Sequence, residues 1–200
     1  SRGDHGGSNA PLRGAKGSSW EGGYRVPCVM RWPGRIPEAQ ERRGMTSSID
    51  LLPTICELTG ASVPGDRIID GRSMVPLFEE NEVEPVIRDT FFYYFKDDLE
   101  GVRHGDWKLI VRRRGEIEPE LYNLSKDVSE TNNIYGANLE VAAELKKLLG
   151  ACRQDLGDSA VGMEGAGCRP AGVAADPKPL TEYDPDHPYI IALYDLKDAG

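Results

Sequence analysis

The segment with the clearest chemical meaning is a glycine-rich run that carries a lysine, residues 11–23. Lys16 follows Gly14 and Ala15 and directly precedes Gly17. A cation on a long stem, set in backbone without bulky side chains, can reach an oxyanion that comes close to the main chain. The run therefore predicts an anion site centred on Lys16. The alternative is that the glycines only form turns and that Lys16 is solvated.

Two elements that would position this run follow it along the chain. The apolar residues 26–33 are typical of a short buried strand, which a Pro-Gly turn ends. Further on, Ser47 or Ser48 can cap a helix that Gly60 closes. We expect five side chains to face inward around this helix: Ile49, Leu52, Ile55, Cys56 and Leu58.

From about residue 88 the pattern changes to short strands separated by turns. Strand-like segments lie at residues 89–95, 101–103, 107–111 and 120–124, and they predict a small antiparallel sheet. Residues 138–156 show an apolar period near 3.6 and predict a helix that covers one face of this sheet, with Asn138 at its start. Its apolar positions are Leu139, Ala142, Leu145, Leu149 and Leu156.

Several motifs in the first 150 residues carry a family resemblance. They are residues 12–23, 25–27, 31–34, 48–54, 70–73, 102–110, 120–127 and 130–133. In their residues, order and spacing these motifs resemble the C-terminal half of the type I sulfatases, the arylsulfatase branch of the alkaline-phosphatase-like superfamily. The resemblance implies an α/β fold class, namely the C-terminal part of an alkaline-phosphatase-like sulfatase fold, with a small four-stranded antiparallel sheet covered by a helix.

The same resemblance implies a division into three parts. Residues 1–87 would be the C-terminal end of the main catalytic α/β domain, with the lysine run, the strand and the first helix. Residues 88–156 would form a small α+β subdomain, and residues 157–200 an extended C-terminal arm. Within that arm we expect residues 189–194 to be pinned to the body, and Asp184, Asp186 and His187 to form a turn and not a metal site.

The activity that the resemblance implies is hydrolysis of sulfate monoesters to an alcohol and inorganic sulfate. Lys16 matches the family lysine that contacts a sulfate oxygen and the bridging oxygen, so it would stabilise charge on the departing alkoxide. Arg13 and His5 lie close enough in sequence to bind substrate in the same pocket. Two alternatives stay open: Arg13 pairs with a carboxylate such as Glu21, and His5 is an ordinary exposed loop residue.

Other parts of the family's chemistry have no counterpart in this sequence. The family uses a cysteine or serine in a Cys-X-Pro-Ser-Arg type motif, oxidised to formylglycine, and a Ca²⁺ ion held by acidic and asparagine side chains. Neither pattern occurs here, and the sequence has no initiating Met. We therefore expect the nucleophile motif and the calcium ligands upstream of this chain, and we expect the chain to be inactive alone. Cys168 begins only a partial look-alike of the nucleophile motif, and Asp4 falls beyond the ligand pair, so no metal ligand is assigned.

Charge and composition narrow the expected partners. Residues 1–43 carry a net charge of +4 and the other residues −13, within a total of −9. An acidic chain argues against general nucleic-acid binding, and no membrane span is apparent. We therefore expect a sulfated small molecule or glycan and the N-terminal part of the same polypeptide as partners. By resemblance the location would be periplasmic or secreted.

Two other functions stay open at this point. One is a phosphoester or phosphonate hydrolase on the same scaffold, and the other is a noncatalytic glycan-binding module. His104 lies in a predicted turn, where we expect a structural or substrate-rim role. The four cysteines have no metal-type spacing, and Cys28 and Cys56 are expected as buried free thiols.

Overall fold

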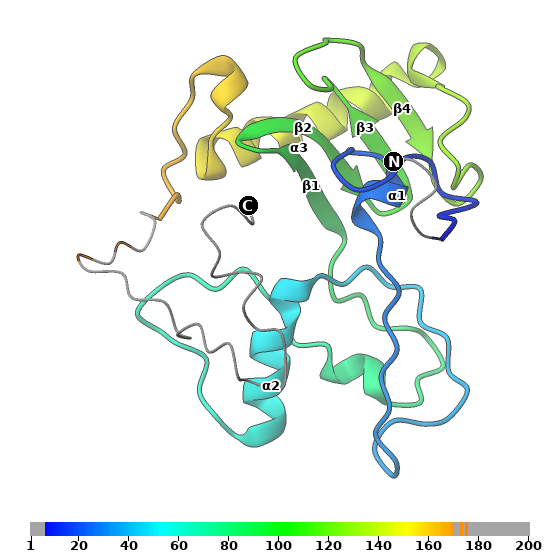
Figure 1. Ribbon diagram of the computed structural model, residues 1–200, viewed down its shortest axis with the longest axis vertical. Coiled ribbons are helices and arrows are strands. Elements are labelled where there is room, and N and C mark those ends of the chain that lie inside the picture. The colour runs from blue at the N-terminus through cyan, green and yellow to red at the C-terminus, as the bar shows by residue number, and fades with distance from the viewer. Residues whose placement is uncertain (1–6, 170–172, 174, 176–200) are drawn as a thin grey trace, which may run out of the picture. The chain divides into compact units, whose positions relative to one another are not determined.

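The computed structural model describes residues 7–169, 173 and 175, and a four-stranded antiparallel sheet dominates its later part (Figure 1). The strands are β1 (Thr90–Phe95), β2 (Asp98–His104), β3 (Trp107–Ile110) and β4 (Glu120–Asn123), and they lie in the order β1-β2-β3-β4. Gly101 of β2 pairs with Ile110 of β3, and a Cβ atom at Gly101 would lie 2.5 Å from the Leu109 carbonyl oxygen. The predicted sheet is confirmed.

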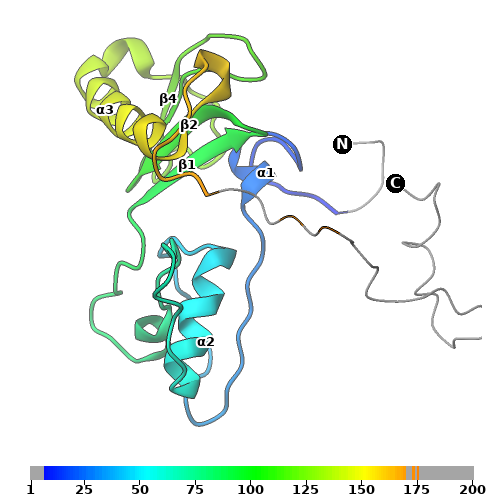
Figure 2. The same cartoon turned by 90° about the vertical axis from the view of Figure 1, so that its left-hand side faces the viewer.

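Helix α3 (Leu139–Leu156) covers one face of this sheet, as Figure 2 shows. The core between them contains Leu99, Val102, Leu109 and Leu121 from the sheet and Ala142, Leu145, Leu149 and Cys152 from the helix. The predicted helix is confirmed, but Leu139 and Leu156 are exposed. An 18-residue helix is about 27 Å long, longer than a sheet of four short strands is wide, so its two ends extend past the core. Asn138 precedes the helix without a capping hydrogen bond from its side chain.

A second helical region lies earlier in the chain. It contains the 3₁₀ turn η1 (Ser48–Asp50), helix α2 (Leu51–Thr59) and the 3₁₀ turn η2 (Val75–Phe78). Gly60 ends α2 in the left-handed conformation, with φ of 74°, as the sequence predicts. The buried Asp50 carboxylate fixes the start of the helix, since it accepts the Ser47 backbone N–H at 2.7 Å and pairs with Arg88 at 2.6 Å.

Two predictions for this region are wrong. Residues 26–33 form no strand, and Val26 and Val29 are 81% and 93% exposed. A strand needs a neighbour to pair its backbone groups, and no described segment runs beside this one as a ladder. Cys28 is accordingly exposed, whereas Cys56 is a buried free thiol as predicted.

The predicted inward face of α2 is right only in part, since Cys56 is buried and Leu58 partly buried, whereas Leu52 and Ile55 are exposed. Pro53, Thr54 and Cys56 are buried, because this face packs toward residues 70–78, where the Thr54 hydroxyl accepts the Met74 backbone N–H. The apolar stripe of the helix, formed by Leu51, Leu52 and Ile55, faces outward instead, and Ile49 in η1 is exposed as well.

The described part of the predicted C-terminal arm is short. After α3, the 3₁₀ turn η4 (Ser159–Val161) follows the buried Asp158, whose carboxylate accepts the Leu99 backbone N–H. The expected apolar segment at residues 189–194 and the turn with Asp184, Asp186 and His187 lie outside the described residues. Within the described ranges, no helix has the length and apolar character needed to cross a membrane.

Candidate active site

Residues 11–23, here called the lysine loop, fold back on themselves and end in the one-turn helix α1 (Glu21–Tyr24). The Gly22 backbone N–H donates to the Arg13 carbonyl oxygen at 2.8 Å, which brings the two ends of the loop together. The Asn9 side-chain amide donates to the carbonyl oxygens of Gly14 and Gly22 at 3.1 and 2.9 Å. The glycine-rich sequence thus forms a compact loop that is closed by its own backbone.

Close backbone contact explains why glycine is needed where the loop closes. A Cβ atom at Gly23 would lie 2.0 Å from the Ser18 carbonyl oxygen, a distance at which backbone must move. We expect Gly23→Ala to distort the loop and to lower stability by about 1 to 3 kcal/mol. Gly136→Ala is the matched control, because its Cβ meets no heavy atom within 4 Å. Urea unfolding of both variants measures the difference, and equal midpoints would contradict the expectation.

Lys16 lies at the tip of this loop. The Ser18 backbone N–H donates to the Ala15 carbonyl oxygen at 3.1 Å, which forms a tight turn around Lys16 and Gly17. Gly17 has φ of 83°, a conformation that favours glycine. Lys16 is exposed, and in the described part of the chain no carboxylate forms an ion pair with it. Its ammonium group is therefore available to an external anion.

The face of the sheet opposite α3 supports the lysine loop (Figure 2). Alternation along the strands directs Leu109 into the α3 core and its neighbour Lys108 to this other face. There Lys108 and Tyr93 both reach the carboxylate of Glu21, the first residue of α1. Polar side chains of the sheet thus attach to the loop just after its tip.

A buried charge cluster makes this attachment. Lys108 is fully buried, and its Nζ lies 2.9 Å from Glu21 Oε1, 2.8 Å from Glu130 Oε1 and 4.1 Å from the centre of the Tyr93 ring. Arg103 adds a second cation 3.3 Å from Glu21 Oε2. The Glu21 backbone N–H donates to Glu130 Oε2 at 2.7 Å. The cluster therefore fixes the end of the lysine loop to the sheet.

The two carboxyl groups of the cluster respond differently to their surroundings. Burial raises the pKa of both, but at Glu21 the Lys108 charge and the hydrogen bonds from Lys108 and Tyr93 outweigh burial, so the pKa of Glu21 is lowered. At Glu130 burial prevails over the attraction of Lys108, so the pKa of Glu130 is raised. Lys108 lies equally close to both carboxylates, but Glu21 has Tyr93 and Arg103 as additional partners, so the surroundings favour the negative charge on Glu21 more than on Glu130.

Arg13 lies at the other end of the loop and is also held by the sheet region. Its Nη1 donates to the Glu130 carbonyl oxygen at 2.7 Å and lies 3.3 Å from the Tyr122 hydroxyl. Its guanidinium carbon stacks 3.6 Å from the centre of the Trp20 ring. Arg13 does not pair with Glu21, the alternative considered from sequence, because other cations occupy that carboxylate. Substrate contact by Arg13 stays a prediction.

Of the histidine and aspartate candidates from the sequence, only His104 lies among the described residues. His5 and Asp4 lie outside the described residues, so the predicted role of His5 in substrate binding stays a prediction. His104 is exposed at the end of β2, where its Nδ1 lies 2.8 Å from the Thr90 hydroxyl. Lys108 and Glu130 were not singled out from sequence, although both lie within motifs that carry the family resemblance.

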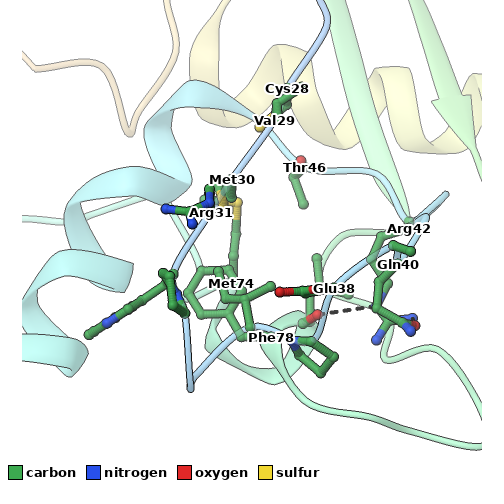
Figure 3. A pocket seen from close by; sticks show the side chains of 17 residues that line it. Cys28, Val29, Met30, Arg31, Glu38, Gln40, Arg42, Thr46, Met74 and Phe78 are labelled. Atoms are coloured by element: carbon green, nitrogen blue, oxygen red, sulfur yellow. Dashed lines mark hydrogen bonds between the residues drawn. The ribbon is translucent and has the colours of Figure 1, made fainter.

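A cavity of about 490 Å³ lies in the earlier helical region (Figure 3). It is bounded by residues 28–46 and by η2, and its lining is mostly apolar, with Met30, Met74 and Phe78 among the labelled side chains. Neither Lys16 nor any member of the charge cluster lines it. Across the residues that the structure describes, no three or more His, Cys, Asp or Glu side chains come together as a metal site.

Comparison with known proteins gives consistent results. Residues 15–155 match the family described as N-sulphoglucosamine sulphohydrolase, C-terminal. The steryl-sulfatase of Mus musculus is 43% identical over 98 residues, which are 49% of this chain and 16% of that protein. The arylsulfatase of Hemicentrotus pulcherrimus is 37% identical over 121 residues, 60% of this chain and 21% of that protein.

A solved structure agrees in fold as well as in sequence. The crystal structure of Ps i-CgsB in complex with k-i-k-neocarrahexaose is similar with a TM-score of 0.60 and 29% identity, over 72% of this chain and 32% of that one. This chain therefore spans about a third or less of the length of these relatives.

Proposed function

Because this chain belongs to the N-sulphoglucosamine sulphohydrolase C-terminal family, and so to the sulfatases, we propose that it supplies the lysine of an enzyme that hydrolyses sulfate monoesters to an alcohol and inorganic sulfate. The observation that carries the proposal is the state of Lys16. Its ammonium is exposed and without a carboxylate partner in the described chain, on a loop that is closed by its own backbone and tied to a sheet.

The chemistry of Lys16 in this proposal is electrostatic. One oxygen of the bound sulfate and the oxygen that bridges to the leaving alcohol would both accept from its ammonium group. As the sulfur–oxygen bond breaks, negative charge develops on the bridging oxygen, and a fixed cation stabilises that charge without reorganising. The ammonium can also give a proton to the departing alkoxide. The rigid attachment at Glu21 supports this role, because a preformed cation needs a fixed backbone.

The nucleophile and the metal belong to other parts of the proposed enzyme. A formylglycine hydrate would supply the attacking oxygen, and Ca²⁺ would supply charge neutralisation when bound. The described residues bring no acidic cluster together, so they do not fit a calcium site. We assign both groups to the N-terminal portion of the polypeptide.

Exposed apolar surface supports the proposal that such a portion packs on this chain. Residues 26–32 are extended and largely exposed, and the apolar stripe of α2 also faces outward. Exposed apolar surfaces often mark places that another segment or partner covers. We propose that the main α/β domain covers both surfaces.

The substrate class is proposed as a sulfated small molecule or glycan. The relatives include a steryl-sulfatase, and a similar structure was solved with neocarrahexaose, an oligosaccharide. A steryl group and an oligosaccharide have different ring systems. We therefore propose that the common element that this chain would recognise is the sulfate ester itself.

An assay of the complete polypeptide tests the proposal. We expect it to hydrolyse an aryl sulfate ester much faster than the matching aryl phosphate ester, and we expect residues 1–200 alone to hydrolyse neither. Preference for the phosphate ester would instead support a phosphohydrolase on this scaffold. Calcium-independent binding of sulfated glycans by residues 1–200, with no hydrolysis by the complete polypeptide, would support a noncatalytic binding module.

A further inference from the structure

A second arginine approaches the tip of the lysine loop from the sheet region. Arg114 follows β3, and its Nη2 donates to the carbonyl oxygen of Gly17 at 2.7 Å. Gly17 is the residue directly after Lys16, and Arg114 is 97 positions away in sequence. The guanidinium carbon also lies 5.0 Å from the centre of the Phe95 ring. Arg114 thus contacts the backbone of the turn that presents Lys16.

A buried carboxylate joins the two segments that meet here. Glu100 is almost fully buried, and its Oε2 accepts the hydroxyl of Ser19 in the lysine loop. Its Oε1 accepts the backbone N–H of Arg114. One side chain therefore holds both the backbone of Arg114 and Ser19, which lies two residues after Gly17 in the lysine loop. In the described chain no cation pairs with Glu100, so both of its oxygens serve these hydrogen bonds.

The backbone at Arg114 is held in an uncommon conformation. Its φ is 48° and that of Gly115 is 90°, so two successive residues have positive φ. For a residue with a Cβ atom this conformation is disfavoured, and it persists where surrounding contacts hold it. Here Arg114 and Gly115 are the two central residues of a tight turn, because the backbones of Arg113 and Glu116 exchange hydrogen bonds at 2.8 and 3.0 Å, and a two-residue turn of this kind has positive φ at both positions. The turn and the Glu100 hydrogen bond together hold the backbone from which the guanidinium reaches Gly17.

Resting on the proposed function, we propose that Arg114, supported by Glu100, is a positioning residue for Lys16. Gly17 has great backbone freedom, and among the described residues no ion pair fixes the exposed Lys16 side chain. The hydrogen bond from Arg114 removes that freedom at the residue next to Lys16. Arg114 then acts on hydrolysis through the placement of the ammonium and not by touching the ester.

The positioning contact is tested first in the chain of residues 1–200, without any assay of activity. Asparagine tolerates positive φ, so Arg114→Asn removes the guanidinium and keeps the backbone conformation. We expect the Ser18 amide, which donates to the Ala15 carbonyl, to exchange with solvent about tenfold faster or more. Arg67→Asn is the control, because exposed Arg67 forms its ion pair with the neighbouring Asp66, far from the lysine loop in sequence. Unchanged exchange in Arg114→Asn would overturn the proposal, and Arg114→Lys gives the same test if the first variant does not fold.

Kinetics of the complete polypeptide test the consequence. Displacing a catalytic group by about 1 Å can cost roughly a hundredfold in rate, so we expect Arg114→Asn to lower kcat about tenfold to a hundredfold with little change in KM. Added guanidinium ion should restore part of kcat, which it would not do for a fold defect. An unchanged kcat, or a loss that guanidinium does not restore, would overturn the proposal. If the unmodified polypeptide does not hydrolyse sulfate esters, the proposed function fails, while amide exchange still decides the Arg114 contact.

Discussion

Replacing Lys16 with methionine in the complete polypeptide should lower kcat for a sulfate ester by about a hundredfold to a thousandfold. Methionine keeps most of the side-chain length and removes the charge. Because Lys16 is exposed and makes no ion pair in the described chain, the thermal midpoint should stay the same. Steady-state kinetics on an aryl sulfate, together with a thermal melt, measure both quantities.

A matched control distinguishes this loss from a general charge effect. Lys126 is also exposed, and it lies outside the lysine loop, so Lys126→Met removes the same charge from another part of the surface. We expect the control to retain the kcat of the parent. If Lys16→Met retains it as well, Lys16 has no part in hydrolysis.

The second large effect concerns stability. Lys108→Met should lower the free energy of unfolding by about 3 to 5 kcal/mol, because it leaves the buried carboxylates of Glu21 and Glu130 without the cation between them. Chemical denaturation followed by circular dichroism measures this loss. Lys147→Met is the control, since exposed Lys147 pairs with exposed Glu144 and such pairs contribute little. If Lys108→Met and Lys147→Met had the same unfolding midpoint, the buried charge cluster would not contribute to stability.

The two carboxyl groups should contribute to stability in opposite directions as pH changes. The pKa of Glu21 is lowered in the folded state, so its contribution is present above its unfolded pKa and is lost as pH falls through the folded pKa. The pKa of Glu130 is raised by burial, so its protonation favours folding as pH falls toward its unfolded pKa. We therefore expect Glu130→Gln to cost less stability at neutral pH than Glu21→Gln. Unfolding curves of both variants from neutral to acidic pH measure these losses of stability. Equal losses at neutral pH would contradict the expectation.

Much of the fold can be predicted because its signals are local. Alternating strands and the 3.6-residue period of α3 identify the sheet and its covering helix, and Gly60 marks the end of α2. The prediction fails where structure depends on a distant partner. Residues 26–33 have the composition of a strand but no described ladder partner, and the apolar stripe of α2 faces outward for lack of a described element to cover it.

The site was predictable only in part. Glycine spacing and the family resemblance identify Lys16, because both are features of one continuous run. The cluster beneath it joins Glu21 to Lys108 and Glu130, which are 87 and 109 positions away. Alternation along β3 gives Lys108 a polar position that looks solvent-exposed, and it is buried because the lysine loop covers that face. No sequence pattern within a single segment predicts such a contact.

The central claim is that the Lys16 ammonium contacts the sulfate group at the reacting centre. A crystal structure of the complete polypeptide with bound sulfate measures this contact directly. Our account predicts the Lys16 Nζ within hydrogen-bonding distance, about 2.7 to 3.2 Å, of a sulfate oxygen, with the lysine loop closed as it is here. A sulfate bound beside the nucleophile while Lys16 extends into solvent would contradict it.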